Sequence, residues 1–323
     1  MINPDQHRIP TGIEPHTPAL DLLEGVDLSG KTAVVTGGHS GIGLETTRAL
    51  AAKGARIIVP ARNAKSAGEA LASVPGEIQI ASMDLSDLST VKSFGNEMRD
   101  SLSALHILIN NAGVMACPPG QTKSGWETQF GTNHLGHMAL TLELLPLLRS
   151  ALSSRVVCLS STGHAVSDIH WEDPNFRDHD YDKWQAYGQS KTANALFAVG
   201  LDQREKANDL RAYAVHPGGI FTNLQRHLPE EEMVILGWKN EDGTIPPRVQ
   251  KSFKTPAAGA STSVFAATST ALNHIGGVYC EDCDVADVAE PDTPRYHKVR
   301  PYAVDTEAAD RLWSLSMELL GDA

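Results

Sequence analysis

The sequence predicts a single α/β domain built on a doubly wound, mostly parallel sheet of seven strands, with helices on both faces. Short β-branched runs alternate with longer helix-like segments, which is typical of a parallel sheet covered on both sides. A glycine-rich turn joins the first such run to the first helix. No Gly/Ser-rich or Pro-rich linker divides the 323 residues, so we expect one domain rather than two.

The expected elements follow from this alternation. Strands are predicted at 32–36, 56–61, 78–83, 105–110, 154–160 and 211–215, with a short one near 277–279. Helices are predicted at 41–53, 64–73, 88–102, 122–151, 181–208, 255–268 and 305–320. The domain then spans 29–323, with a substrate-loop region at 224–254 and a helical tail at 286–323. Residues 1–28 form an N-terminal extension that we expect to lie on the surface or to be partly disordered.

Composition and charge argue against several classes of protein. The formal net charge of −12 disfavours binding to nucleic acid or to an anionic membrane surface. No stretch reaches the ~18–20 apolar residues needed to span a bilayer. Four cysteines without an apolar signal core indicate a reducing, cytoplasmic setting, in which Cys280 and Cys283 are expected to be free thiols. The acidic run 230–232 is expected to be a solvated face.

The first functional motif is the glycine-rich turn, which lies between a buried strand at 31–36 and a helix at 44–53. Glycines let the backbone approach a pyrophosphate, and the N-terminus of the following helix favours its negative charge. The spacing differs from the GxGxxG fingerprint, and a plain tight turn is the alternative. The residues expected to hold the dinucleotide here are Gly37, His39, Ser40, Gly41, Ile42 and Gly43.

Tyr187 and Lys191 form the second motif. They lie four residues apart and therefore share one face of the helix predicted at 181–208. An ammonium group beside a phenol favours the phenolate, so we expect the pKa of Tyr187 to fall below its usual value near 10. The phenol would then serve as a proton donor and acceptor. Taken alone, this spacing also fits an ordinary exposed helix pair.

Together these motifs resemble those of the short-chain dehydrogenase/reductase family. The family's TGxxxGIG loop matches 36–43, its NNAG matches 110–113, and its serine pair matches Ser160 and Ser161. Its YxxxK matches 187–191 and its PGxVxT matches 217–222, with isoleucine for valine. The NHLGH run at 133–137 and the long insert after Ser161 are similar to the retinol-dehydrogenase-like, carbonyl reductase branch. The resemblance covers roughly 31–285 and implies a Rossmann-type oxidoreductase that uses NAD(P) on CH–OH or C=O groups.

One position argues for the preferred cofactor. Arg62 ends the second predicted strand, where an acidic residue would bind the 2′-hydroxyl of NAD. A guanidinium pairs with a 2′-phosphate and stacks on adenine, so NADP(H) is preferred over NAD(H). A solvated surface charge is the alternative for Arg62, as a turn residue is for His39. The resemblance implies further cofactor contacts at Asp84, Leu85, Asn111, Ala112, Gly113, Tyr187, Lys191, Pro217, Gly218, Ile220 and Thr222.

The resemblance also implies the catalytic roles. The cofactor supplies a hydride, Tyr187 gives the proton, and Lys191 lowers the pKa of that tyrosine. Ser161 donates a hydrogen bond to the substrate oxygen. Asn133 is expected to bind a water that connects Lys191 with solvent, with an ordinary helix hydrogen bond as the alternative. His134 and His137 share a helix face, but no third ligand accompanies them, so no metal site is expected.

The expected substrate is a hydrophobic ketone or aldehyde, or the corresponding alcohol. Apolar side chains in 224–254 are numerous enough to line its pocket, although they could instead pack on the core. A regulatory NADP-binding protein without turnover and an enzyme acting on a C=C bond are the alternative functions. Related proteins often pair through the two long helices, here 122–151 and 181–208, which would give a homodimer or homotetramer. The chain's two ends could equally cap a monomer.

Overall fold

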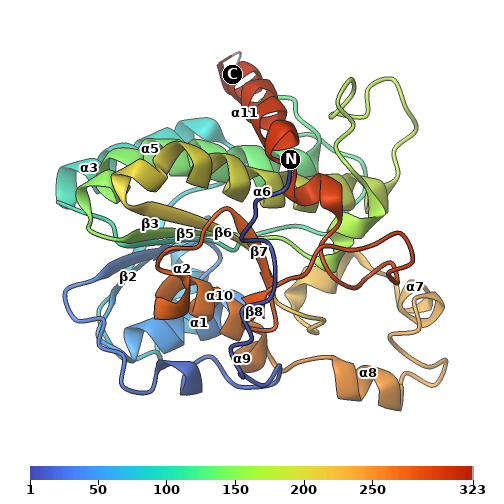
Figure 1. Ribbon diagram of the computed structural model, residues 1–323, viewed down its shortest axis with the longest axis horizontal. Coiled ribbons are helices and arrows are strands. Elements are labelled where there is room, and N and C mark those ends of the chain that lie inside the picture. The colour runs from blue at the N-terminus through green and yellow to red at the C-terminus, as the bar shows by residue number, and fades with distance from the viewer. Residues whose placement is uncertain (322–323) are drawn as a thin grey trace.

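A central sheet of eight strands organises the computed structural model, which describes residues 1–321 (Figure 1). Its strand order is β3-β2-β1-β4-β5-β6-β7-β8, parallel throughout except for the last pair. The predicted doubly wound α/β fold is confirmed, and the order reverses between β1 and β4, where such sheets bind ligands. The strands are β1 Thr32–Val35, β2 Arg56–Ala61, β3 Ile78–Ser82, β4 Ile107–Asn110, β5 Ser154–Leu159, β6 Leu210–His216, β7 Val278–Glu281 and β8 Asp284–Val285.

The predicted count of seven strands is wrong by one, because β8 turns back against β7. Asp282 and Cys283 connect the two strands with φ angles of 48° and 57°. Positive φ at both central residues is the geometry of a tight hairpin turn, for which Asn-Gly and Asp-Gly are the usual signals. The pair Asp-Cys carries only half of that signal, and a two-residue strand has no periodicity to detect.

Helices cover both faces of the sheet (Figure 1). Alternate residues of β1 show the two layers, since Val34 packs with Phe94 on one face while Val35 packs with Leu50 on the other. The first layer contains α3 (Leu88–Ser101), α5 (Gly136–Ser150) and α6 (Lys183–Glu205); the second contains α1 (Gly41–Ala51), α2 (Ala64–Leu71) and α10 (Ser261–Thr268).

Two predicted helices are interrupted. The segment expected at 122–151 begins only at α4 (Thr128–Phe130), continues as a π-helical turn (Gly131–Leu135) and then becomes α5. The segment expected at 255–268 is divided into α9 (Pro256–Gly259) and α10. Single π-helical turns inside α-helices are frequent at functional sites. This one contains Asn133.

The C-terminal helix α11 (Thr306–Gly321) packs along α6. Its Trp313 stacks on Phe197 with ring centroids 5.8 Å apart, and the guanidinium of Arg204 lies 4.3 Å from the centroid of Trp313. Ser316 Oγ lies 2.8 Å from a ring nitrogen of the buried His134. The face of α6 that points away from the sheet is thus covered by the chain itself.

Residues 1–13, which we call the N-terminal strap, run along the β7–β8 edge. Gln6 Nε2 donates to Ala286 O (2.6 Å) and Gln6 Oε1 accepts from Tyr279 N (2.8 Å). Thr306 N donates to Met1 O (2.8 Å). Neither expectation describes the whole N-terminal extension, since the strap is held by specific bonds and Ala19, Leu23 and Leu28 are buried in the hydrophobic core. The strap shields a sheet edge that would otherwise offer unpaired groups.

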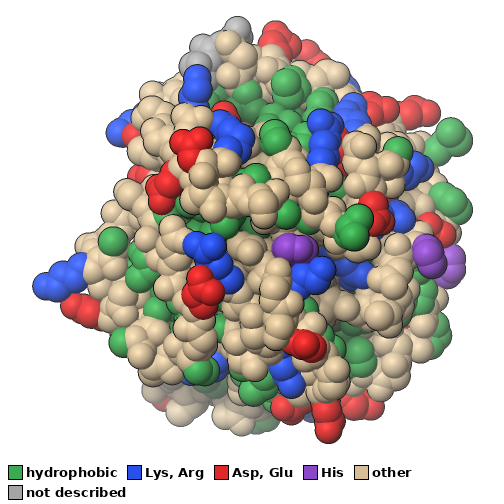
Figure 2. Space-filling model, turned by 90° about the vertical axis from the view of Figure 1, so that its left-hand side faces the viewer, with side chains coloured by type: hydrophobic (Ala, Val, Ile, Leu, Met, Phe, Trp, Pro, Cys, Tyr) green, Lys and Arg blue, Asp and Glu red, His purple; other side chains and the backbone are tan. Residues whose placement is uncertain are grey.

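On the side of the molecule that lies to the left in Figure 1, positively and negatively charged side chains are mixed rather than gathered into patches of one sign. Figure 2 shows this face, on which Lys and Arg side chains alternate with Asp and Glu. Within residues 1–321, none of the helices has both the length and the apolar character that crossing a lipid bilayer requires.

Candidate functional site

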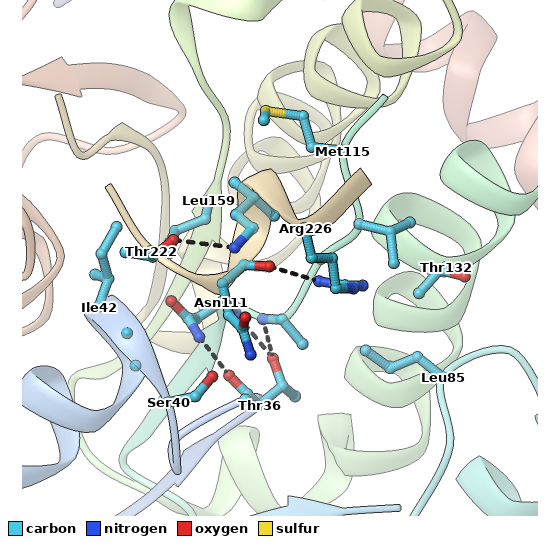
Figure 3. A pocket seen from close by; sticks show the side chains of 18 of the residues that line it. Thr36, Ser40, Ile42, Leu85, Asn111, Met115, Thr132, Leu159, Thr222 and Arg226 are labelled. Atoms are coloured by element: carbon cyan, nitrogen blue, oxygen red, sulfur yellow. Dashed lines mark hydrogen bonds between the residues drawn. The ribbon is translucent and has the colours of Figure 1, made fainter. Parts of the chain in front are cut away.

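A pocket of about 810 Å³ lies at the carboxyl ends of β1, β2, β4, β5 and β6 (Figure 3). Residues predicted from separate motifs, up to 186 positions apart in the sequence from Thr36 to Thr222, line this one cavity. Every residue predicted to hold the cofactor or to act in the reaction is among the lining residues, except Asn133. The parallel sheet brings these motifs together because each follows the carboxyl end of a strand.

The glycine loop forms a tight cradle at the end of β1. Gly37 adopts φ +64°, in the left-handed region that favours glycine. A Cβ on Gly43 would lie 2.3 Å from the carbonyl oxygen of Gly37, so no side chain fits there. Ser40 occupies the N-cap of α1, but its side chain makes no capping bond to the helix. The loop therefore brings bare backbone and a helix N-terminus to the pocket, which fits the diphosphate of a dinucleotide.

His39 and Arg62 lie together at the edge of the same pocket. Burial, and next the charge of Arg62, lower the pKa of His39. Within residues 1–321, Nδ1 of His39 is buried without a hydrogen-bond partner. Arg62 is exposed, while the next residue, Asn63, caps α2 by accepting from Ser66 N (3.0 Å). A phosphate between His39 and Arg62 would give both side chains a partner.

The segment after β4 is held against the end of β1 by Thr36. Thr36 Oγ1 accepts from the backbone N–H groups of Asn111 (2.8 Å) and Ala112 (2.9 Å). Asn111 Nδ2 donates back to Thr36 O (2.7 Å). Farther along the pocket, Asp84 accepts from the N–H and the hydroxyl of Ser86, and the N-cap of α3 is Asp87 rather than Asp84.

His137 links this network to the π-helical turn that carries Asn133, a role that the sequence analysis missed. Its Nδ1 lies 2.8 Å from Asn133 O, and because a carbonyl can only accept, Nδ1 carries the proton. Its Nε2 then accepts from Thr36 Oγ1 (2.8 Å). Burial lowers the pKa of His137 to about 4, so the ring stays neutral at physiological pH. A histidine four residues after an asparagine carries no sequence signal that distinguishes this linkage from ordinary core packing.

Asn133 stands behind the pocket wall rather than in it. Its amide accepts from Val114 N (2.9 Å) and donates to Val114 O (2.9 Å) and Ser190 Oγ (2.9 Å). A Cβ on Gly113 would lie 3.2 Å from Asn133 Oδ1 and 3.7 Å from Lys191 Nζ. The side chain thus joins the segment after β4 to α6, one residue before Lys191.

Tyr187 and Lys191 lie side by side on α6, with Nζ 5.6 Å from the centroid of the tyrosine ring. Lys191 Nζ donates to Leu159 O (3.0 Å), and burial lowers the pKa of Lys191 to about 8. Burial raises the pKa of Tyr187 to about 12, an effect opposed by a hydrogen bond with Ser161. The expected lowering of the Tyr187 pKa is therefore wrong here, because burial dominates. At neutral pH the tyrosine holds its proton.

The two adjacent serines differ in what they contact. Ser160 is buried, and its hydroxyl donates to Lys191 O (2.7 Å). Ser161 faces the pocket, and its Oγ accepts from Gly163 N (3.0 Å). Of the two serines, Ser161 is the one that hydrogen-bonds the side chain of Tyr187. His164 fixes this loop, since its Nδ1 lies 2.6 Å from Ser161 O.

The loop after β6 closes the pocket against the glycine loop. Pro217, Gly218, Ile220 and Thr222 all line the cavity. A Cβ on Gly41 would lie 3.3 Å from Cβ of Thr222, so the two loops touch. Thr222 Oγ1 itself accepts from Leu224 N (3.2 Å) and begins a short 3₁₀ turn.

The substrate-loop region carries α7 (Glu230–Ile235) and α8 (Pro247–Ser252). Glu232 binds Lys183 and accepts from Trp184 Nε1 (2.8 Å), so the acidic run is not simply a solvated face. The prediction agrees with the exposed Glu230 and Glu231 but fails for Glu232, because the partners of Glu232 lie 48 and 49 positions away in the sequence. Trp238 and Phe253, 5.9 Å apart, line the pocket beyond Tyr187.

Comparison with known proteins agrees with this geometry. The family model of the short chain dehydrogenases matches residues 31–233, which is more than half of the chain. The chain belongs to the short-chain dehydrogenase/reductase family. It is 44% identical over 300 residues to a Streptomyces lividans protein called "Probable oxidoreductase", covering 91% of this chain and 99% of that one. It is 36% identical to Retinol dehydrogenase 12 of Mus musculus, covering 92% of this chain and 88% of that protein.

A solved structure shares the architecture of this short-chain dehydrogenase/reductase. An uncharacterized protein from Mycobacterium Paratuberculosis superposes with a TM-score of 0.69 at 33% identity, covering 91% of this chain and 95% of that one. Together these findings make the protein an NAD(P)-dependent oxidoreductase of the retinol-dehydrogenase-like type. The resemblance drawn from the motifs is confirmed.

Proposed function

We propose that this short-chain dehydrogenase/reductase uses NADP(H) to interconvert a hydrophobic ketone or aldehyde and its alcohol. The observation that carries the proposal is one cavity lined by the glycine loop, Arg62 and the group Ser161, Tyr187 and Lys191. A cofactor-binding regulator would need the glycine loop but not a buried proton donor beside a serine.

The glycine loop would hold the cofactor's diphosphate, and Arg62 with His39 would hold the 2′-phosphate. When bound, the nicotinamide supplies or accepts the hydride. The partnerless Nδ1 of His39 and the exposed guanidinium of Arg62 support this placement. NADH lacks the group that these two side chains would bind.

The proton step follows from the protonation states. As the carbonyl carbon gains a hydride, Tyr187 gives its phenolic proton to the carbonyl oxygen, and the resulting phenolate lies beside the ammonium of Lys191. With a pKa of about 8, Lys191 is predominantly charged at neutral pH. Ser161 stabilises the charge that develops on the oxygen. Alcohol oxidation is the reverse of these steps.

The walls beyond Tyr187 support an apolar substrate. Trp238, Phe253, Met115 and Leu224 line that part of the pocket. Aromatic and aliphatic walls with few polar groups favour bulky hydrophobic molecules. The Ser161–Tyr187 pairing favours a carbonyl oxygen over a C=C bond, which offers no oxygen to accept the proton.

The test measures NADPH oxidation as a loss of near-ultraviolet absorbance. The protein is assayed with a panel of bulky ketones, aldehydes and quinones, and NADH is run in parallel. We expect turnover with NADPH on at least one carbonyl. NADPH binding without turnover on any member of the panel would instead favour the regulatory protein.

Sedimentation of the same sample distinguishes a monomer from a homodimer or homotetramer, which could pair through α6 only if α11 moved.

Ser161→Ala is expected to lower kcat by about 10²–10³-fold, the usual cost of removing one oxyanion donor. The reason is that Ser161 lines the pocket and hydrogen-bonds Tyr187, whereas the hydroxyl of Ser160 is engaged with Lys191 O (2.7 Å). Steady-state kinetics on the best carbonyl of the panel measure the effect. Ser160→Ala is the matched control, and a larger loss in that variant would reassign the role to Ser160.

A further inference from the structure

Three lysine or arginine side chains line the pocket, and the proposed function uses only two of them. Arg62 is placed at the 2′-phosphate and Lys191 at the reacting end, while Arg226 has no role so far. We propose that Arg226 is a diphosphate-binding residue, which holds the cofactor from the side opposite the glycine loop. This inference rests on the proposed dinucleotide-dependent function.

The position of Arg226 is set by a rigid turn that begins beside the phosphate cradle. Arg226 lies in the 3₁₀ turn Asn223–His227, immediately after Thr222. A capping box closes this turn, since Thr222 N donates to Gln225 Oε1 (2.9 Å) and Leu224 N donates to Thr222 Oγ1 (3.2 Å). Thr222 also touches Gly41, as described above. The backbone that carries Arg226 is thus fixed against the glycine loop.

The side chain of Arg226 extends into the pocket. Figure 3 shows it reaching from the turn toward Thr132 and Leu85, which belong to the other wall. Its one bond is from Nη1 to the carbonyl oxygen of Asn223 (3.1 Å). Among residues 1–321, no carboxylate lies within ion-pair distance of its guanidinium. Asp84, the one carboxylate that lines the pocket within residues 1–321, is engaged with Ser86.

The charge of the diphosphate provides the physical reason for such a residue. The glycine loop contributes backbone N–H groups and the dipole of α1, but no full positive charge. Arg62 directly follows β2, at the place proposed for the 2′-phosphate. A guanidinium binds a phosphate bidentately. Arg226 is the remaining cation that can balance this charge.

This role differs from that of Arg62 in a measurable way. The diphosphate is common to NADPH and NADH, whereas the 2′-phosphate belongs to NADPH alone. Loss of Arg226 should therefore weaken both cofactors by the same factor. Loss of Arg62 should weaken NADPH far more than NADH.

The experiment measures Kd for NADPH and NADH by fluorescence with the wild type, Arg226→Gln, Arg62→Gln and Arg248→Gln. We expect Arg226→Gln to raise both Kd values by about tenfold or more, the typical cost of losing a hydrogen bond between charged groups. Arg248→Gln is the matched control, because Arg248 lies in the same region and its Nη2 bonds Gly237 O (2.9 Å), but it does not line the pocket. Its Kd values should equal those of the wild type.

Two competing ligands then locate the contact. ADP carries both phosphates of the diphosphate, whereas adenosine 2′,5′-bisphosphate carries only the one next to the adenosine, so Arg226→Gln should weaken ADP as a competitor of NADPH at least as much as it weakens the bisphosphate. Unchanged binding of ADP, weakening confined to the bisphosphate, or unchanged Kd values for both cofactors would overturn the assignment. An increase confined to the KM of the carbonyl would also overturn it and would give Arg226 to the substrate. If the wild type bound neither cofactor, the proposed function itself would fail, independently of Arg226.

Discussion

Tyr187→Phe is expected to lower kcat for carbonyl reduction by about two to four orders of magnitude, the usual contribution of a positioned proton donor. The variant loses only the phenolic oxygen, while the ring keeps its buried place against Gly163, where a Cβ would lie 2.7 Å from the ring. Lys191 does not occupy the place of the phenolic oxygen, because its Nζ is held by Leu159 O (3.0 Å) and lies 5.6 Å from the centroid of the tyrosine ring. Steady-state turnover and NADPH fluorescence titration measure chemistry and binding separately.

The matched control is Tyr213→Phe. Tyr213 is also fully buried and its hydroxyl donates to Leu272 O (2.9 Å), but it does not line the pocket. This variant should lose stability through its broken hydrogen bond and keep its kcat. Near-normal turnover in Tyr187→Phe would remove the tyrosine from the proton step, whatever the control shows.

Arg62→Asp is expected to reverse or strongly reduce the preference for NADPH over NADH. Removing a charge-assisted contact with the 2′-phosphate costs about 1.5–3 kcal/mol, or roughly 10- to 100-fold in affinity. The new carboxylate adds repulsion toward that phosphate and can accept from the 2′-hydroxyl of NADH. The ratio of kcat/KM for the two cofactors is the measurement.

Lys65→Asp provides the comparison for this charge reversal. Lys65 lies three positions later on α2 and is exposed, but it does not line the pocket. The Lys65→Asp substitution changes the net charge by the same amount as Arg62→Asp but lies outside the proposed phosphate site. A cofactor ratio that stays constant in Arg62→Asp, or that shifts equally in Lys65→Asp, would contradict a direct contact between Arg62 and the 2′-phosphate.

Sequence alone identified the residues of the pocket because the fold places them by a simple rule. In a parallel sheet the segments after the strands meet at one edge, so motifs as distant as Gly37 and Thr222 could be assigned to one site. Residue type, chain order and the family resemblance, which supplied the contacts at Asp84, Asn111 and Thr222, were together sufficient for this step. The assignment of these motifs to one site did not depend on knowing how deeply any side chain is buried.

Predictions that depended on burial or on distant partners were less successful. The pKa of Tyr187 was expected to fall because Lys191 is its neighbour in sequence, but desolvation outweighs that neighbour. Glu232 finds its partners on α6 only through the tertiary fold. His137 gains its role from a threonine 101 positions away. Such contacts leave no periodic trace in a single sequence.

The N-terminal strap determines the order in which the newly made chain can reach its final form. Residues 1–13 leave the ribosome long before residues 276–306, yet the partners of Gln6 lie 273 and 280 positions later. Contacts so remote in sequence form late, because closing a long loop costs entropy before any bond is gained. Until synthesis passes Ala286, the sheet edge that the strap covers does not exist, so the strap has no partner to bond. Residues 1–13 are therefore among the last parts of this domain to fold, although they are made before the strands that hold them.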